Sequence, residues 1–306
     1  MRRVLITGGA GFIGSHLAEA CLPRAKVRVL DDLSSGQAGN LSGVDVEFQR
    51  GSILNPHDLA RAMDGVDSVF HLAAFVSVAA SMEQPEECAQ LNVTGMLRVL
   101  QAAEHAGVRR LVFASSAAVY GDDRVVPKHE GMAPVPLSPY AMTKLDGEFY
   151  CRLFQNRGRL GTACARFFNV FGPRQDPRSS YAAAVPRLVT RALAGEDLVI
   201  YGDGLQTRDF VFVGDIASGL VHLESRPDLT GVFNLGLGVA TSVTDLAGSI
   251  LRLTGSRSRL RHEPARPGEI RHSVASVDRI RSTGWSPGWG LDEGLDATVE
   301  WYRRQG

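Results

Sequence analysis

Tyr140 and Lys144 stand four residues apart in the segment SPYAMTK, residues 138–144. On a helix, this spacing places both side chains on one face. An isolated pair of this kind is more often a core aromatic ring beside a solvated lysine. It can also be a phenol held beside an ammonium group, which favours the phenolate and lowers a phenol pKa that is otherwise about 10. The surrounding sequence has to distinguish these interpretations.

Ser116 is a third polar side chain that could join this pair. It ends the β-rich run RRLVFASS (109–116), directly after Ser115 and 24 residues before Tyr140. Open α/β sheets place their chemistry at the carboxyl ends of their strands. With Tyr140 and Lys144, Ser116 would form a general-base site that removes a hydroxyl proton while hydride leaves the same carbon.

A glycine-rich turn, TGGAGFIG (7–14), follows the first β-rich run and opens a helical pattern. Gly8 permits a tight turn, Gly11 lets the backbone approach a pyrophosphate, and Gly14 allows close helix–strand packing. Phosphate would then lie on the N–H groups at the helix N-terminus. Asp31, 23 residues after Gly8, ends the second strand, where a carboxylate can bind a ribose diol and would repel a 2′-phosphate. The sequence therefore predicts NAD as cofactor, in preference to NADP.

The elements that must position these residues alternate along the first half of the chain. Strands are expected at 3–8, 26–31, 46–51, 68–74 and 109–116, and helices at 12–22 and roughly 84–106. Strands that alternate with helices predict an α/β fold with a parallel, doubly wound (Rossmann) sheet. His71, in the fourth of these strands, is expected to be a satisfied core histidine rather than a catalyst.

The second half has a looser pattern of prolines and short runs, which predicts a smaller C-terminal α+β lobe. We expect residues 1–168 to bind NAD and residues 169–306 to form the substrate lobe, with some chain crossing back to the sheet.

Composition excludes several classes of partner. The chain has 306 residues, with 33 basic and 33 acidic side chains, so no net charge favours nucleic acid or an anionic membrane. Cys21, Cys88, Cys151 and Cys164 lack metal-ligand spacing, and no run of 18 apolar residues occurs. We expect a soluble cytoplasmic protein with no metal, no nucleic-acid partner and no membrane partner.

The glycine turn, the acidic residue 31, the serine after the fifth strand and the Y-x-x-x-K pair resemble the extended short-chain dehydrogenase/reductase family. More narrowly, five segments resemble the nucleotide-sugar 4-epimerases that act on UDP-glucose and UDP-N-acetylglucosamine. They are DDLSSG (31–36), SSAAVYG (115–121), RFFNVFGPRQDP (166–177), GDGLQTRDFVFVGD (202–215) and RPGEIRHS (266–273).

This resemblance implies roles by position. Ser116, Tyr140 and Lys144 would be the catalytic set. Residues implied to contact NAD are Gly8, Gly11, Phe12, Ile13, Asp31, Asp32, Ser35, Gly36, Ser52, Ile53, Leu72, Ala73, Ala74, Val76, Asn92, Ala114, Tyr140, Lys144 and Phe167. Residues implied to contact a UDP-sugar are Val78, Ser116, Tyr140, Asn169, Ala184, Val185, Val199, Tyr201, Arg208, Arg266, Glu269 and Ser273. The two arginines suit a diphosphate, which guanidinium groups bind bidentately.

Four positions bear on the cofactor and the reaction that the resemblance implies. Ser52 stands where the family usually has an aspartate beside adenine. Ala117 and Ala118 replace the Asp-Glu pair of the 4,6-dehydratases and the glutamate of the decarboxylases, and a methyl group cannot transfer a proton. Ser273 occupies the position where a large tyrosine restricts the pocket to plain hexoses, so a serine there favours N-acetylated sugars as well.

The resemblance therefore implies 4-epimerisation of UDP-GlcNAc/UDP-GalNAc, of UDP-Glc/UDP-Gal, or of both. A UDP-glucuronate 4-epimerase, a 4-keto nucleotide-sugar reductase and a non-catalytic NAD-binding scaffold remain alternatives. The family often forms homodimers through two helices per subunit, and the helical patterns at 84–106 and 139–155 could serve this purpose.

Overall fold

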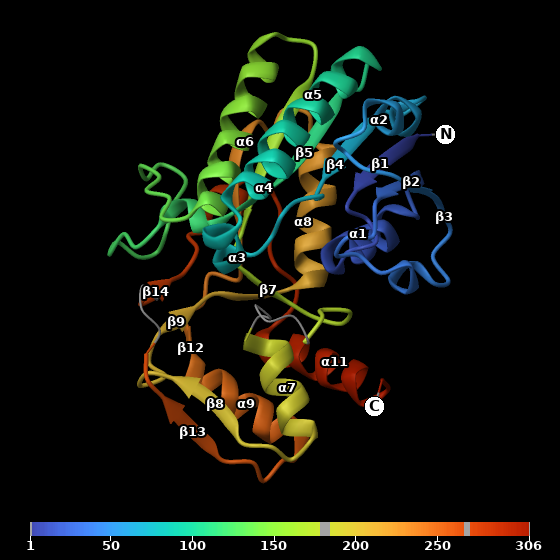
Figure 1. The fold of residues 1–306 in the computed structure, drawn as a ribbon. Helices are drawn as coiled ribbons and strands as arrows, with labels where there is room; N and C mark the ends of the chain where they lie inside the picture. Colours follow the sequence, from blue (N-terminus) through green and yellow to red (C-terminus); the bar gives the residue numbers. More distant parts are fainter. Residues whose placement is uncertain (1, 178–183, 266–269, 306) are drawn as a thin grey trace.

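A seven-stranded sheet forms the centre of the larger part of the molecule (Figure 1). The computed structural model describes residues 2–177, 184–265 and 270–305. The strands are β1 (Arg3–Thr7), β2 (Lys26–Asp31), β3 (Val46–Arg50), β4 (Ser68–His71), β5 (Arg110–Ser116), β6 (Gly161–Phe167) and β11 (Gly231–Leu235). They lie in the order β11-β6-β5-β4-β1-β2-β3, and all neighbours are parallel. The order reverses between β1 and β4, so the predicted doubly wound sheet is confirmed.

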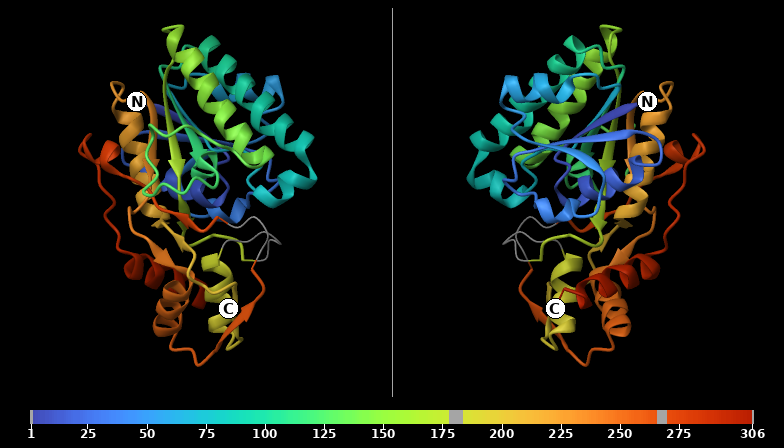
Figure 2. Two further views of the ribbon diagram at one scale, coloured as in Figure 1. Left: turned by 90° about the vertical axis from the view of Figure 1, so that its left-hand side faces the viewer. Right: turned by 90° about the vertical axis from the view of Figure 1, so that its right-hand side faces the viewer.

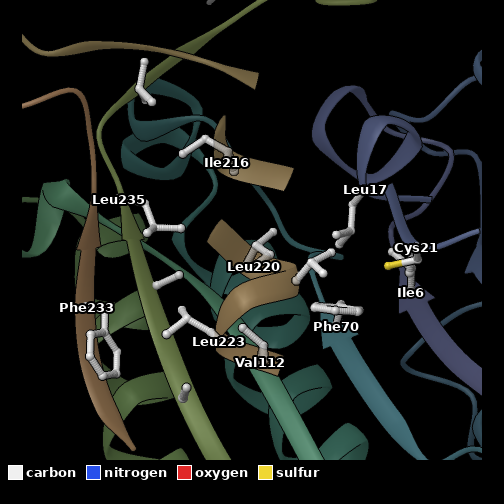
Figure 3. Close-up of a cluster of buried hydrophobic side chains, with 14 of the residues drawn as sticks. Ile6, Leu17, Cys21, Phe70, Val112, Ile216, Leu220, Leu223, Phe233 and Leu235 are labelled. Carbon is white, nitrogen blue, oxygen red and sulfur yellow. The ribbon is translucent and has the colours of Figure 1, made fainter. Parts of the chain in front are cut away.

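Helices cover both faces of this sheet, because its inner strands carry apolar side chains on both sides. One face packs against α1 (Phe12–Cys21) and α8 (Val213–Ser225), and the other against α2 (Pro56–Met63), α5 (Gly95–His105) and α6 (Pro139–Asn156). Figure 3 shows Leu220 and Leu223 of α8 close to Val112 and Phe70 of the sheet, and Ile216 belongs to the same cluster. Cys21, on α1, lies in the same apolar cluster.

The helical pattern expected at roughly 84–106 is divided into three pieces. α4 (Pro85–Ala89) leads into a π-helical turn over Gln90–Thr94, and α5 follows directly. α3 (Val78–Glu83) precedes them, and two short 3₁₀ turns span Ala38–Leu41 and Ala117–Tyr120. A π turn inserts an extra residue into the helical hydrogen-bond ladder and often occurs at functional sites. Here it carries Asn92.

A smaller α+β part lies beyond one end of the sheet (Figure 2), as predicted. Its helices are α7 (Ala184–Leu193), α9 (Val243–Thr254) and α11 (Leu291–Arg303), and the short α10 (Asp278–Arg281) packs near β11. Its strands form three small sheets: β7 (Asn169–Phe171) with β10 (Phe210–Phe212), β8 (Leu198–Tyr201) with β13 (Leu260–Glu263), and β9 (Thr207–Arg208) between β12 (Thr241–Ser242) and β14 (His272–Ser273). α8 and β11 return from this half of the chain to the large sheet. The division at residue 168 stays a prediction.

Across the described ranges, no helix combines the length and the apolar character that crossing a membrane requires. The same residues contain no group of three or more His, Cys, Asp or Glu side chains that could hold a metal ion. All four cysteines are buried free thiols.

Candidate active site

A cavity of about 650 Å³ opens at the carboxyl ends of the central strands. Most of the residues predicted to contact NAD line it, although they come from separate strands and loops. They are Gly8, Gly11, Phe12, Ile13, Asp31, Asp32, Ser35, Ile53, Leu72, Ala73, Ala74, Val76, Ala114, Tyr140, Lys144 and Phe167. Ser116 lines the same cavity, so the fold brings the predicted catalytic and cofactor residues to one place.

The glycine turn forms one end of this cavity. Gly8 has a φ of +74°, and a Cβ there would lie 2.7 Å from the backbone nitrogen of Ala73. A Cβ on Gly14 would lie 2.2 Å from the carbonyl oxygen of Gly8. Gly11 is the N-cap of α1, where no side chain of the described residues caps the helix. Backbone N–H groups at such a terminus suit a phosphate, so the residues present fit the pyrophosphate of NAD.

Asp31 holds this turn against the end of β2. Its carboxylate accepts hydrogen bonds from the backbone nitrogens of Ala10 and Leu33, both at 2.9 Å, and burial raises its pKa. A Cβ on Gly36 would lie 2.9 Å from Oδ1 of Asp31, so a glycine allows the chain to pass close by. Gly36 therefore lies behind the cavity lining, beside the carboxylate predicted to bind ribose.

The catalytic candidates come from two elements. Ser138 caps α6 by accepting a hydrogen bond from Ala141 N at 3.1 Å, and this sets Tyr140 in the first turn. The backbone nitrogen of Tyr140 donates to Oγ of Ser81 at 3.2 Å, which ties the start of α6 to α3. Ser116 ends β5, and its hydroxyl oxygen accepts from Ala118 N at 3.1 Å. The hydroxyl proton of Ser116 thus remains available for the phenol oxygen of Tyr140.

Burial sets the electrostatics of this site in the protein alone. Burial raises the pKa of Tyr140, and hydrogen bonding with Ser116 opposes that rise. Burial also lowers the pKa of Lys144 to about 8. The expectation is that Lys144 and the positively charged NAD ring together favour the phenolate. In the protein alone the pKa of Tyr140 is raised rather than lowered, because burial penalises the charged form.

Besides Gly36, two residues predicted to contact NAD, Ser52 and Asn92, lie outside the cavity lining. Asn92 accepts a hydrogen bond from Phe75 N at 2.7 Å and donates to Phe75 O at 3.1 Å and to Thr143 Oγ1 at 3.0 Å. It thereby holds the loop after β4, which lines the cavity, against α6. The hydroxyl of Ser52 accepts from Leu54 N at 3.2 Å and begins the turn before α2.

His71 is a core histidine, as predicted. Its Nδ1 is hydrogen-bonded to Oγ1 of Thr7 at 2.7 Å, and its ring stacks on Phe113 with centroids 5.8 Å apart. Burial lowers the pKa of His71 to about 3, so the ring is neutral at physiological pH.

The residues predicted to contact a UDP-sugar are more dispersed. Apart from Ser116 and Tyr140, those within the described ranges lie outside the lining of the 650 Å³ cavity. Asn169, Arg208 and Ser273 are neighbours: Arg208 pairs with Ser273 in the register of β9 and β14, and Asn169 N donates to Asp209 O at 2.9 Å. Val78 begins α3, Ala184 and Val185 begin α7, and Val199 and Tyr201 lie on β8. Arg266 and Glu269 lie outside the described residues.

Sequence reasoning missed part of the cavity wall. Gln175 and Asp176 line it from the loop after β7, and Oε1 of Gln175 is a buried acceptor without a partner in the described part of the chain. Other lining residues that had not been predicted are Gly14, Leu30, Ser34, Gly51, Leu91, Ser115, Phe168 and Val170. The proline-flanked run GPRQDP, which the resemblance already included, was the available signal for Gln175 and Asp176.

Comparisons with known proteins agree on one family. The model of the NAD dependent epimerase/dehydratase family matches residues 4–236. The chain is 38% identical to a UDP-glucose 4-epimerase of Mycolicibacterium smegmatis, over 99% of each protein. Its structure matches the UDP-N-acetylglucosamine 4-epimerase of Methanobrevibacter ruminantium, solved with UDP-N-acetylmuramic acid. The TM-score is 0.96 and the identity 36%, over 100% of this chain and 99% of that one. A UDP-N-acetyl-alpha-D-glucosaminuronate decarboxylase of Bacillus cytotoxicus is 32% identical, over 99% of this chain and 98% of that protein.

Proposed function

Since this chain belongs to the NAD dependent epimerase/dehydratase family and is an NAD-dependent enzyme, we propose that it inverts carbon 4 of a UDP-hexose through a 4-keto intermediate. The observation that carries this proposal is the meeting of Ser116, Tyr140 and Lys144 on the wall of the cavity that also contains the glycine turn. A scaffold that only bound NAD would have no need of a phenol on the cavity wall beside a buried lysine.

The three side chains divide the proton transfer among them. Tyr140 takes the proton of the sugar 4-hydroxyl, and Ser116 donates a hydrogen bond that stabilises the phenolate. Lys144 adds a cation one helical turn away. Bound NAD would supply the hydride acceptor and a positive charge that favours the phenolate. The 4-keto sugar turns about its diphosphate link, and Tyr140 returns the proton when the opposite face is reduced.

The residues beside Ser116 favour epimerisation over the other reactions of the family. Ala117 and Ala118 begin the 3₁₀ turn that Ser116 caps, at the position where a dehydratase or a decarboxylase would have acidic groups. Their methyl groups leave Tyr140 as the group that transfers protons. The two alanines therefore count against decarboxylation, although a decarboxylase of Bacillus cytotoxicus is 32% identical to the chain.

We propose that the sugar is UDP-GlcNAc/UDP-GalNAc, UDP-Glc/UDP-Gal, or both. Asn169, Arg208 and Ser273 would face the sugar nucleotide, as the resemblance implies, and β14 places the small Ser273 beside Arg208. Arg208 suits the diphosphate, and a serine leaves room for an N-acetyl group. The relatives named for UDP-glucose and UDP-N-acetylglucosamine support both sugars.

The purified protein should be incubated separately with UDP-Glc, UDP-GlcNAc and UDP-GlcA, and the C4 epimers followed by NMR. We expect galacto-configured products from at least one of the first two substrates. Turnover of UDP-GlcA alone would favour the alternative, a UDP-glucuronate 4-epimerase. A requirement for added reduced cofactor in stoichiometric amounts would favour a 4-keto sugar reductase.

A homodimer is also part of the proposal. Met142, Phe149 and Leu153 are 48%, 44% and 56% exposed and form one stripe along α6, which lies beside α5 (Figure 1). Apolar side chains on a shared stripe are typical of an interface between helices. Light scattering should give a dimer, and Phe149→Glu should shift it toward the monomer.

A further inference from the structure

A buried ion pair lies directly behind the proposed catalytic residues. Nε and Nη2 of Arg166 donate to Oε1 and Oε2 of Glu148 at 2.8 and 2.7 Å, and the two side chains are 4% and 5% exposed. Oγ of Ser115 donates to the same Oε1 at 2.5 Å. Three directional hydrogen bonds therefore converge on one carboxylate.

Each member of this group is next to a residue of the cavity. Ser115 precedes Ser116 on β5, and Arg166 precedes Phe167 on β6. Glu148 lies one turn after Lys144 on α6, and therefore two turns after Tyr140. The pair thus connects the three elements that deliver the proposed catalytic serine, the tyrosine–lysine pair and one wall of the cofactor site.

The connection continues toward the smaller lobe. The guanidinium of Arg166 lies 4.6 Å from the centroid of the Tyr120 ring, and the Tyr120 hydroxyl donates to Oδ1 of Asn234 at 2.7 Å. Nδ2 of Asn234 then donates to the carbonyl oxygens of Lys128 at 2.8 Å and Ser276 at 3.2 Å. Ser276 follows β14 by three residues, so the chain of contacts ends close to the strand that carries Ser273.

We propose that Glu148 and Arg166 are positioning residues, which fix Ser116 relative to Tyr140 and Lys144 during catalysis. This inference rests on the proposed function. A buried ion pair contributes little more to stability than a well-packed apolar pair would. Apolar contacts such as those of Cys151 and Phe154 already hold α6 against the sheet. The ion pair adds a fixed orientation that apolar contacts do not give. The two hydrogen bonds from Arg166 and the one from the Ser115 hydroxyl hold the Glu148 carboxylate, and so fix the angle between α6 and the end of β5.

The mildest test is Ser115→Ala, which removes the link between β5 and the ion pair and leaves both charges in place. We expect kcat to fall about tenfold with KM unchanged, because an interaction needed in the transition state is lost. Glu104→Gln is the matched control. Glu104 pairs with Arg157, which follows α6, at 3.0 Å on the side of the protein away from the cavity. The Glu104→Gln variant should have a lower unfolding temperature than the wild type and the same kcat.

The double variant Glu148→Leu/Arg166→Met separates positioning from stability. Its unfolding temperature should lie close to that of the wild type, since an apolar pair replaces the ion pair. Its kcat should still fall about 100-fold, which a displacement of about 1 Å can cause. A double variant that has both the wild-type unfolding temperature and the wild-type kcat would overturn the proposal. If the double variant does not fold, a wild-type kcat in Ser115→Ala overturns it instead.

A readout independent of turnover keeps this test separate from that of the proposed function. The protein can be labelled with carbon-13 tyrosine, and the NMR signal of Tyr140 identified by its absence in Tyr140→Phe. This signal should shift in Ser115→Ala and keep its position in Glu104→Gln. If the wild type inverts no UDP-hexose, the proposed function fails, while a shifted Tyr140 signal still supports the positioning role. An unchanged signal in Ser115→Ala overturns that role.

Discussion

Nζ of Lys144 lies 5.7 Å from the centroid of the Tyr140 ring and donates a hydrogen bond to the carbonyl oxygen of Ala114 at 2.9 Å. The lysine is therefore held by the end of β5, the strand that also supplies Ser116. Lys144 is 4% exposed, while Tyr140 is half-buried and lines the cavity, so burial makes the charged form of each group costly. The site is arranged so that proton transfer depends on neighbouring groups rather than on solvent.

The first prediction concerns the proposed base. Tyr140→Phe removes the phenol oxygen and keeps the ring, so epimerisation should fall by about 10³-fold or more. The NAD content of the purified protein should stay at the wild-type level, because the glycine turn is untouched. Tyr150→Phe, on the same helix, is the control and should remain active. Activity within tenfold of the wild type in Tyr140→Phe would exclude the phenol as the base.

The second prediction concerns pH and Lys144. The pKa of Lys144 is lowered from 10.5 to about 8, so between these values the unfolded chain binds a proton that the native protein does not. This group therefore makes stability rise with pH across that range, by up to about 3 kcal/mol. Lys144→Met removes this contribution. Below pH 8 the variant should be more stable than the wild type, and the difference should shrink toward pH 10.5.

Urea unfolding at several pH values measures this difference, and contributions from other titrating groups cancel in it. If the difference in unfolding free energy between the variant and the wild type stays constant from pH 7 to 10.5, burial of the Lys144 ammonium does not lower stability. The same variant should lose most of its epimerase activity, since Tyr140 would lack its cationic neighbour.

The third prediction tests the glycine turn. A Cβ on Gly11 would meet only Gly8 O among the described residues, at 3.2 Å, so Gly11→Ala should fold. Its methyl group would occupy the surface on which the pyrophosphate is proposed to lie, and NAD affinity should fall about tenfold or more. Gly39→Ala is the control, because a Cβ there meets nothing within 4 Å in the described residues. Calorimetric titration with NAD measures both variants. Equal affinities would mean that the pyrophosphate lies elsewhere.

The fourth prediction tests the proposed choice of sugar. Ser273→Tyr should reduce kcat/KM for UDP-GlcNAc by at least about tenfold relative to UDP-Glc, because the larger side chain fills the space of the N-acetyl group. Competition between the two substrates in one NMR sample gives the ratio directly. An unchanged ratio would remove Ser273 from the specificity pocket.

The parts of the fold that could be predicted are those that local patterns encode. The β-rich runs and the glycine turn correspond to β1–β5 and the start of α1, since burial on both faces of a parallel sheet requires apolar strands. The clustering of Ser116, Tyr140 and Lys144 follows from the rule that strands end at one edge of the sheet.

Other features depend on the assembled structure. The π turn over Gln90–Thr94 is set by packing and by the contacts of Asn92, so the helical pattern gave no sign of it. Gln175 reaches the cavity because the loop after β7 lies against α1, where Pro173 O is hydrogen-bonded to the ring of His16 and Arg174 pairs with Glu19. The direction of the Tyr140 pKa shift depends on how completely the phenol is buried, which the four-residue spacing to Lys144 does not show.

The most direct measurement follows the hydrogen at carbon 4. UDP-Glc or UDP-GlcNAc carrying deuterium at C4 should be incubated with the purified enzyme in ordinary water, without added cofactor, and the product examined by NMR and mass spectrometry. We predict an inverted product that retains the deuterium at C4, because hydride leaves and returns within one active site. Loss of the deuterium, or a product that lacks its 6-hydroxyl group, would contradict epimerisation at C4.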